Sequence, residues 1–285
     1  MTIRKKKFGW ANIEIPVLGQ GTWMIEGDQL QERKAIEALR LGLDLGLSHI
    51  DTAEMYGNGR AEELVGEAIS TRRSEVFLVS KVLPQNASYK GTLKACERSL
   101  KRLKTEWLDL YLLHWQGQYP IKETMRAMET LVDQGKIRFI GVSNFDLDQI
   151  KEAEQALNHH RLLCNQVLYH LGDRGIERHL IPYCSAQEIS VVAYSPFGHS
   201  DFPSLHSKGG KILSEIASSR GRTIRQIILN FLTRNPAVFT IPKASKTQHI
   251  HENSGSTDWD LLKEDIEIID QAFPAPDYDV PLGML

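Results

Sequence analysis

The sequence predicts one domain, spanning residues 1–285, built as a (β/α)8 barrel with an N-terminal β-hairpin and a C-terminal loop and helix extension. Short β-rich runs that end in polar residues alternate with amphipathic helical stretches, and this alternation is typical of parallel βαβ units. Eight such runs fit within about 250 residues, as the barrel requires. A doubly wound open sheet is the alternative, because alternation alone does not close a barrel, but strand number and chain length favour the barrel.

The strands are predicted from apolar, β-branched runs that stop at a polar side chain. In chain order they cover residues 16–19, 47–51, 76–81, 108–114, 137–143, 162–166, 190–194 and 237–242. The helices are predicted from apolar positions that recur with helical spacing. They cover about residues 32–45, 88–103, 121–134, 147–157, 222–234 and 259–272, and a further helix begins within 243–253.

Composition and charge limit the classes of function. The formal net charge is -2 with no long basic run, which argues against a nucleic-acid-binding protein. The three cysteines are odd in number and widely spaced, so neither a zinc site nor a disulfide framework is expected and a reducing cytoplasm is the simplest location. No segment resembles a signal peptide or a membrane span. We expect no metal and no nucleic-acid or membrane partner, and a monomer or weak dimer.

Four ionisable residues fall at predicted strand ends or just beyond them. Asp51, Lys81 and His114 close the second, third and fourth strands, and Tyr56 lies five positions after Asp51. In a barrel the carboxyl ends of the strands share one face, where catalytic groups gather. Adjacent strands should therefore bring these four side chains together.

The chemistry of such a cluster is specific. A lysine at the end of an apolar strand needs a counter-charge, which Asp51 can supply. An ammonium beside Tyr56 would stabilise the phenolate, so we expect the pKa of Tyr56 to fall and the residue to act as an acid. His114 could orient a carbonyl oxygen. The same residue types also describe metal-dependent hydrolases and Schiff-base lyases, so the cluster alone names no reaction.

Ordered motifs along nearly the whole chain resemble the aldo-keto reductase family. They comprise residues 19–23 (GQGTW), 50–57 (IDTAEMYG), 80–81 (SK), 112–115 (LLHW), 141–145 (GVSNF), 165–166 (NQ) and 241–243 (IPK). The resemblance implies a catalytic tetrad of Asp51, Tyr56, Lys81 and His114, with Tyr56 as the proton donor. Within the family the chain most resembles bacterial members that reduce methylglyoxal, which implies small dicarbonyl substrates.

The family also implies where a nicotinamide cofactor binds. Ser143, Asn144 and Gln166 would hold the carboxamide and Tyr194 would stack on the ring. The full expected cofactor set is Gly21, Thr22, Trp23, Asp51, Ser143, Asn144, Gln166, Tyr194, Ser195, Phe197, Lys243, Ser245, His249 and Asn253. No G-x-G-x-x-G follows a strand, so a Rossmann site is not expected. Phosphate should instead bind at the helix after the last strand, near Lys243.

The cofactor motif departs from the family pattern at two positions. Members that prefer NADPH carry a serine or threonine after the lysine and an arginine six positions after it, where this chain has Ala244 and His249. A neutral imidazole attracts phosphate less than a guanidinium does. We expect NADPH as the cofactor, with NADH as the alternative.

The substrate pocket should be lined by aromatic and apolar residues beside the tetrad: Trp23, Met55, Tyr56, His114 and Trp115. Two irregular segments, 198–210 and 274–285, are candidate lids. The sequence therefore predicts an NAD(P)H-dependent reductase of aldehydes and ketones. A non-catalytic subunit that binds nicotinamide nucleotide is the alternative, and a metal-dependent hydrolase is the third.

Overall fold

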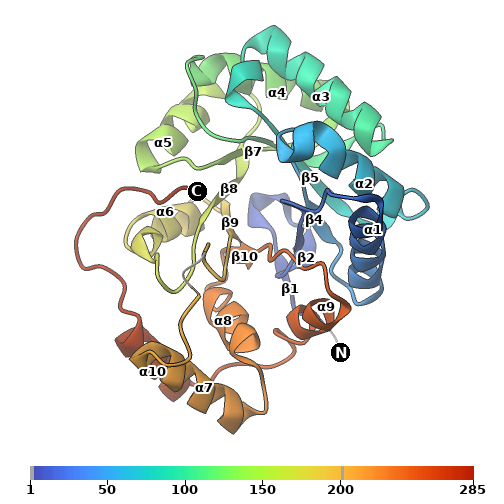
Figure 1. Cartoon of the computed structure of the whole chain (residues 1–285). Coiled ribbons are helices and arrows are strands. Elements are labelled where there is room, and N and C mark those ends of the chain that lie inside the picture. The colour runs from blue at the N-terminus through green and yellow to red at the C-terminus, as the bar shows by residue number, and fades with distance from the viewer. Residues whose placement is uncertain (1–2, 200–201) are drawn as a thin grey trace.

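The computed structural model describes residues 3–199 and 202–285, and eight parallel strands curl around a common axis with helices outside them (Figure 1). The strand order is β10-β9-β8-β7-β6-β5-β4-β3, so each strand pairs with its neighbours in sequence. The strands are β3 (Gln20–Gly21), β4 (His49–Asp51), β5 (Phe77–Val82), β6 (Leu108–Leu113), β7 (Ile137–Ser143), β8 (Leu162–Leu168), β9 (Ser190–Tyr194) and β10 (Val238–Thr240).

Contacts between the first and last strands close the barrel. Parallel bridges join Leu18 to Thr240 and Gly21 to Lys243. The amide of Gly19 donates to the Thr240 carbonyl at 2.8 Å. A Cβ on Gly21 would lie 2.6 Å from the carbonyl oxygen of Ile241, so only glycine allows this close approach. The predicted barrel is confirmed and the open sheet is excluded.

The first strand differs from its predicted position. Pro16 belongs to an antiparallel hairpin of β1 (Lys5–Lys7) and β2 (Glu14–Pro16), where it pairs with Lys5. Proline has no amide hydrogen, so it suits the end of a two-stranded hairpin better than a strand paired on both sides. The barrel begins only with the bridge at Leu18 and continues in β3. The expected strand at residues 16–19 is corrected accordingly.

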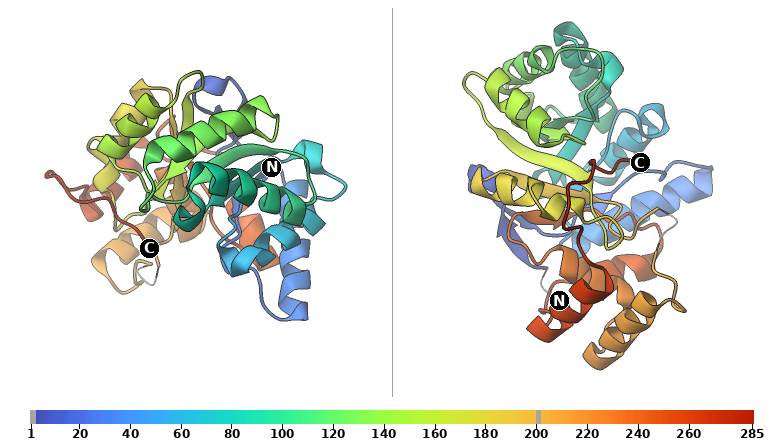
Figure 2. Two further views of the ribbon diagram at one scale, coloured as in Figure 1. Left: turned by 90° about the horizontal axis from the view of Figure 1, so that it is seen from above. Right: turned by 90° about the vertical axis from the view of Figure 1, so that its left-hand side faces the viewer.

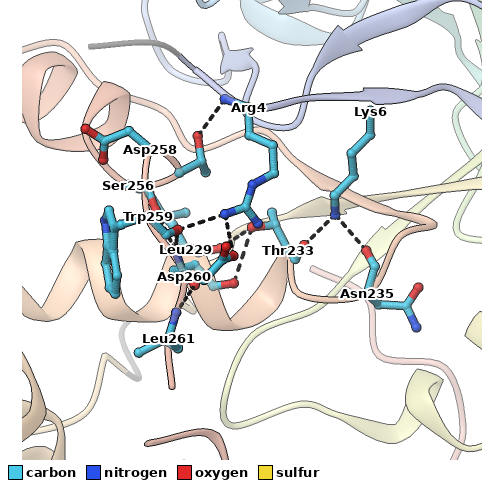
Figure 3. A network of polar contacts seen from close by, with 12 residues as sticks. Arg4, Lys6, Leu229, Thr233, Asn235, Ser256, Asp258, Trp259, Asp260 and Leu261 are labelled. Atoms are coloured by element: carbon cyan, nitrogen blue, oxygen red, sulfur yellow. Dashed lines mark hydrogen bonds and ion pairs between the residues drawn. The ribbon is translucent and has the colours of Figure 1, made fainter. Parts of the chain in front are cut away.

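The hairpin covers the amino ends of the barrel strands. Phe8 is fully buried and packs edge-on against Phe77 and Phe239, with ring centroids 5.3 and 4.8 Å away. Arg4 donates to the Trp259 carbonyl at 2.7 Å, and Lys6 donates to the Asn235 carbonyl at 2.8 Å (Figure 3). Both carbonyls lie in loops of the last third of the chain, so the two cations tie the hairpin to that part of the molecule.

Ten α-helices lie outside the strands in the described residues. They are α1 (Gln29–Asp44), α2 (Arg60–Ala68), α3 (Tyr89–Leu103), α4 (Ile121–Asp133), α5 (Leu147–Ala156), α6 (Leu180–Ala186), α7 (Lys208–Arg220), α8 (Ile224–Leu232), α9 (Thr247–Ser254) and α10 (Lys263–Ala272). The sequence did not predict α2, α6 or α7. The first two are short, and α7 carries Gly209 and Gly210, which have poor helix propensity, in its first turn after a Ser207 cap.

The alternation of side chains along each strand decides which residues reach the interior of the barrel. In β5, Phe77 and Val79 belong to the apolar cluster inside the ring of strands, whereas Leu78 and Val82 belong to the cluster between strands and helices. Because side chains two residues apart share a face, Lys81 continues the inward row. Polar residues at the carboxyl end of such rows must therefore meet above an apolar interior.

The segment after α10 returns toward the strands. Figures 1 and 2 show it running from α10 past α6 to the C-terminal end near the middle of the molecule. Asp279 accepts hydrogen bonds from Arg178 Nε at 2.8 Å and from His179 Nε2 at 3.0 Å. These contacts hold the segment against the loop before α6. Among the described residues, no helix is both long enough and apolar enough to cross a bilayer.

Candidate active site

The four residues predicted as a tetrad meet at the carboxyl ends of neighbouring strands. Lys81 Nζ lies 2.5 Å from Asp51 Oδ1, 2.9 Å from the Thr52 carbonyl oxygen and 3.2 Å from Tyr56 Oη. The rings of Tyr56 and His114 pack edge-to-face with centroids 5.8 Å apart. The ammonium thus uses all three of its donors, and one of them reaches the tyrosine hydroxyl.

Tyr56 reaches the cluster through a short, tightly fastened loop. It begins a 3-10 turn, Tyr56–Gly59, in which Gly57 and Asn58 have φ values of 55° and 54°. These left-handed conformations favour glycine and asparagine. Just before the turn, Glu54 accepts from the amide of Leu83 at 2.8 Å. That bond fixes the loop to the end of β5, so the sequence from Glu54 to Asn58 determines where the hydroxyl lies.

Burial and opposite charge compete at Lys81. The side chain is fully buried, and burial alone would lower its pKa. Asp51 and Tyr56 act in the other direction, and together they raise the pKa of Lys81 above its ordinary value. The residue is therefore a buried ammonium ion paired with a buried carboxylate.

The pKa of Tyr56 departs from the sequence-based expectation. Burial raises it, and Asp51 adds to the rise, whereas Lys81 lowers it by charge and by hydrogen bonding. The net direction is upward, so the predicted fall is wrong, because desolvation of the phenolate outweighs the neighbouring ammonium. Tyr56 thus keeps its proton at neutral pH, and Lys81 limits the cost of giving it up.

His114 is held as a neutral imidazole. Burial, with a further contribution from Lys81, lowers its pKa to about 2. Its Nδ1 atom has no hydrogen-bond partner among the described residues. An imidazole that stays neutral has one N–H to donate but no readily lost proton. His114 is therefore suited to hydrogen bonding with a ligand and Tyr56 is suited to proton donation.

A cavity of about 360 Å³ opens above these residues. It brings together ten of the fourteen predicted cofactor residues and all five predicted substrate residues. Its lining comprises Gly21, Thr22, Trp23, Asp51, Met55, Tyr56, His114, Trp115, Ser143, Asn144, Gln166, Tyr194, Ser195, Ile241, Lys243, Met284 and Leu285. Ile241, Met284 and Leu285 were not predicted individually, although the last two lie within the segment suggested as a lid.

Amide, hydroxyl and aromatic side chains lie together on one wall of this cavity. Asn144 Nδ2 donates to the His114 carbonyl at 3.1 Å and its Oδ1 accepts from Tyr194 Oη at 2.8 Å. Ser143 Oγ donates to the Gln166 carbonyl at 2.9 Å. Asn144 and Ser195 have φ values of 58° and 48°, so the chain turns sharply after β7 and β9. These hydrogen bonds fix the positions of the three side chains on the cavity wall.

Four predicted cofactor residues do not line the cavity. Phe197 packs against Phe202, with Arg225 over its ring at 4.6 Å. Asn253 is buried in a small cleft beside α9, and His249 and Ser245 lie toward the surface at the start of that helix. Of the two candidate lids, part of 198–210 falls outside the described residues, but His199 lies against Trp23 with ring centroids 5.5 Å apart.

Comparisons with known proteins agree with this arrangement. The Aldo/keto reductase family model matches residues 17–273. Methylglyoxal reductase YeaE of Escherichia coli is 42% identical over 96% of both chains. Glyoxal reductase of Bacillus subtilis is 36% identical over 90% of this chain and 89% of its own length. An aldo-keto reductase of Klebsiella pneumoniae, solved in complex with NADPH, is 41% identical over 100% of both chains, with a TM-score of 0.93.

The family match begins at Val17, next to the bridge that closes the barrel, and ends just after α10. It includes every residue of the cluster around Lys81. Sequence motifs, fold and relatives agree along the whole barrel. This chain belongs to the aldo/keto reductase family.

Proposed function

We propose that this oxidoreductase reduces small aldehydes and ketones, with methylglyoxal-like dicarbonyls as the preferred class, and that Tyr56 protonates the carbonyl oxygen. The observation that carries the proposal is the contact between Lys81 Nζ and Tyr56 Oη at 3.2 Å, beneath the cavity and backed by Asp51. A proton donor needs stabilisation of the anion that it becomes. The buried ammonium supplies that stabilisation at the atom where charge develops.

Each of the four residues has a separate role in the proposed proton transfer. Tyr56 passes its hydroxyl proton to the carbonyl oxygen and becomes a phenolate, which Lys81 stabilises. His114 donates a hydrogen bond that orients the same oxygen, because its imidazole stays neutral. Asp51 holds Lys81 in place. Water then returns a proton to Tyr56 after the alcohol leaves.

NADPH, when bound, supplies the hydride to the carbonyl carbon. Ser143, Asn144 and Gln166 would hold its carboxamide beside the Tyr194 ring, and Lys243 would attract a phosphate group. The crystal structure of the Klebsiella relative with NADPH supports this cofactor. His249, in place of the arginine that NADPH-preferring members carry, leaves NADH as the alternative.

The size and lining of the cavity favour a small substrate. Trp23, Met55, Trp115 and Met284 form an apolar rim around the polar floor. Pockets of this size with a largely apolar lining typically bind small molecules rather than extended polymers. The names of the two bacterial relatives, methylglyoxal reductase and glyoxal reductase, support a dicarbonyl.

The proposal is tested by changing Tyr56 to Phe, which removes the hydroxyl and keeps the ring. We expect kcat/KM for methylglyoxal with NADPH to fall by about 10²–10⁴-fold, which is the usual contribution of general acid catalysis. The dissociation constant of NADPH, measured by quenching of protein fluorescence, should change little.

Tyr89→Phe is the matched control, because its hydroxyl bonds Thr130 between α3 and α4, away from the cavity. It should retain wild-type turnover. Full activity in Tyr56→Phe would overturn the assignment. Nucleotide binding without turnover in the wild-type protein, over a panel of aldehydes and ketones, would instead identify the non-catalytic subunit.

A further inference from the structure

The side chain of Gln166 contacts the ion pair beneath the cavity. It extends from β8, and its Nε2 lies 2.7 Å from Asp51 Oδ2. The other oxygen of the same carboxylate, Oδ1, accepts from Lys81 Nζ. Gln166, Asp51 and Lys81 are 2%, 1% and 0% exposed, respectively, so water does not compete for these bonds.

The orientation of the amide follows from its neighbour. A carboxylate paired with an ammonium can only accept hydrogen bonds, so the nitrogen of Gln166 must face Asp51. Its Oε1 atom then remains as the acceptor on the side of the amide away from Asp51, and Gln166 also lines the cavity. One amide group therefore contacts both the floor of the cavity and the carboxylate that holds Lys81.

We propose that Gln166 is a positioning residue for the proton donor, which acts on Tyr56 through Asp51 and Lys81, beyond any role in holding the cofactor. Its N–H fixes one oxygen of Asp51, so that the other oxygen stays on Lys81 and the ammonium stays on Tyr56. The inference rests on the proposed function, because it assigns Gln166 a role in the proton transfer proposed for Tyr56.

The two neighbouring residues provide a contrast. Ser143 Oγ donates to the Gln166 carbonyl, and Asn144 bonds the His114 carbonyl and Tyr194 Oη. Of these three candidate carboxamide-binding residues, only Gln166 has a hydrogen bond to Asp51 in the part of the chain that the structure describes. Losing Ser143 should weaken cofactor binding alone, whereas losing Gln166 should also disturb the proton donor.

Replacing Gln166 with glutamate makes the contact with Asp51 depend on pH. The new carboxyl group, when protonated, would donate its O–H to Asp51, as the amide does, but when ionised it would place two carboxylates in contact. Burial and Asp51 disfavour ionisation, whereas Lys81 favours it, so we expect the pKa of the new carboxyl group to lie above its ordinary value. The other titratable groups around this site are Tyr56, His114, Cys164 and Tyr194.

At saturating NADPH, kcat/KM of Gln166→Glu should be close to wild type at pH 5 and at least about tenfold lower at pH 8, since a carboxylate pair perturbs the site by more than one pKa unit. Gln166→Met, which has no hydrogen-bond donor for Asp51, should lose activity at every pH. Ser143→Ala should raise the NADPH dissociation constant without changing the shape of the pH profile.

A second readout uses the protein without cofactor. A group whose folded-state pKa is raised binds more protons when folded, so its contribution to stability is lost as pH rises through that pKa. The melting temperature of Gln166→Glu should therefore fall relative to wild type between pH 5 and pH 8, and that of Ser143→Ala should not.

The outcomes are distinct. A pH-dependent melting temperature with a pH profile of kcat/KM parallel to wild type would mean that the contact is only structural and would overturn the inference. No pH dependence in either measurement would also overturn it. Retained turnover in Tyr56→Phe overturns the proposed function, and the melting measurement then still reports whether Gln166 and Asp51 are in contact.

Discussion

Replacing His49, a histidine enclosed by the barrel interior, should make the protein more resistant to acid. The residue begins β4, is 0% exposed, and packs between Phe8 and Phe77. Neither ring nitrogen has a hydrogen-bond partner among the described residues. Burial, with a smaller contribution from Lys81, lowers its pKa to about 3. The imidazole is therefore neutral in the folded protein, whereas the unfolded chain can protonate it.

The pH dependence follows from this difference. For a histidine with a lowered folded-state pKa, the unfolded state binds more protons, so stability is complete above pH 6.5 and falls as pH decreases toward 3. At pH 7.5 the loss is negligible, and at pH 5 it is about 2 kcal/mol, since each pKa unit corresponds to 1.36 kcal/mol. His49→Leu removes this term but leaves every other titrating group in place.

The measurement is urea unfolding at pH 7.5 and pH 5.0, followed by both circular dichroism and tryptophan fluorescence so that their coincidence tests two-state behaviour. Between pH 7.5 and pH 5.0 the free energy of unfolding of His49→Leu should fall by about 2 kcal/mol less than that of the wild type. Its packing cost is independent of pH and cancels in this comparison. His49→Phe, with a different packing cost, should show the same difference. Equal losses of stability in wild type and both variants would refute the reasoning.

Two further predictions concern the rim of the cavity and the cofactor. Asp279→Asn weakens the contacts with Arg178 and His179 that hold the final segment, so KM for the carbonyl substrate should rise about two- to fivefold with the NADPH dissociation constant unchanged, as expected for an exposed ion pair. A steady-state assay checks this, and an unchanged KM would mean that Met284 does not help to shape the site. His249→Arg should raise the ratio of kcat/KM for NADPH over NADH about tenfold, because a guanidinium can pair with phosphate through two hydrogen bonds. A ratio that stays at the wild-type value would show that position 249 does not contact the phosphate.

The strand ends were predictable from sequence because they depend on local patterns. An apolar run with a polar last residue shows where a strand stops, and parallel strands place these stops on one face. Asp51, Lys81 and His114 were predicted as the last residues of their strands, and each lies within one residue of the observed strand end. Closure of the barrel was harder to predict from the sequence, because it depends on the contact of Gly21 with Ile241, more than two hundred positions away.

Burial was the quantity that the sequence could not supply. The expected fall in the pKa of Tyr56 was argued from a single neighbour, Lys81, whose effect the structure bears out in sign. Desolvation depends on every atom around the phenol, including those brought by distant segments, and it is the larger effect here. For the same reason, Met284 and Leu285 at the cavity could not be assigned from a tail without periodic pattern.

The buried ion pair is better explained by chemistry than by stability. Moving Lys81 and Asp51 out of water costs several kcal/mol for each ion, and apolar residues of similar size often serve a core equally well. The cost is limited here because the ammonium has three acceptors, one of them Tyr56 Oη, and the carboxylate has Lys81 and Gln166 as donors. A pair used only for stability would not need to direct one of those donors at a tyrosine that lines a cavity. In the proposed reaction, the ammonium already beside that hydroxyl would stabilise the phenolate without rearrangement, which is the condition for electrostatic catalysis.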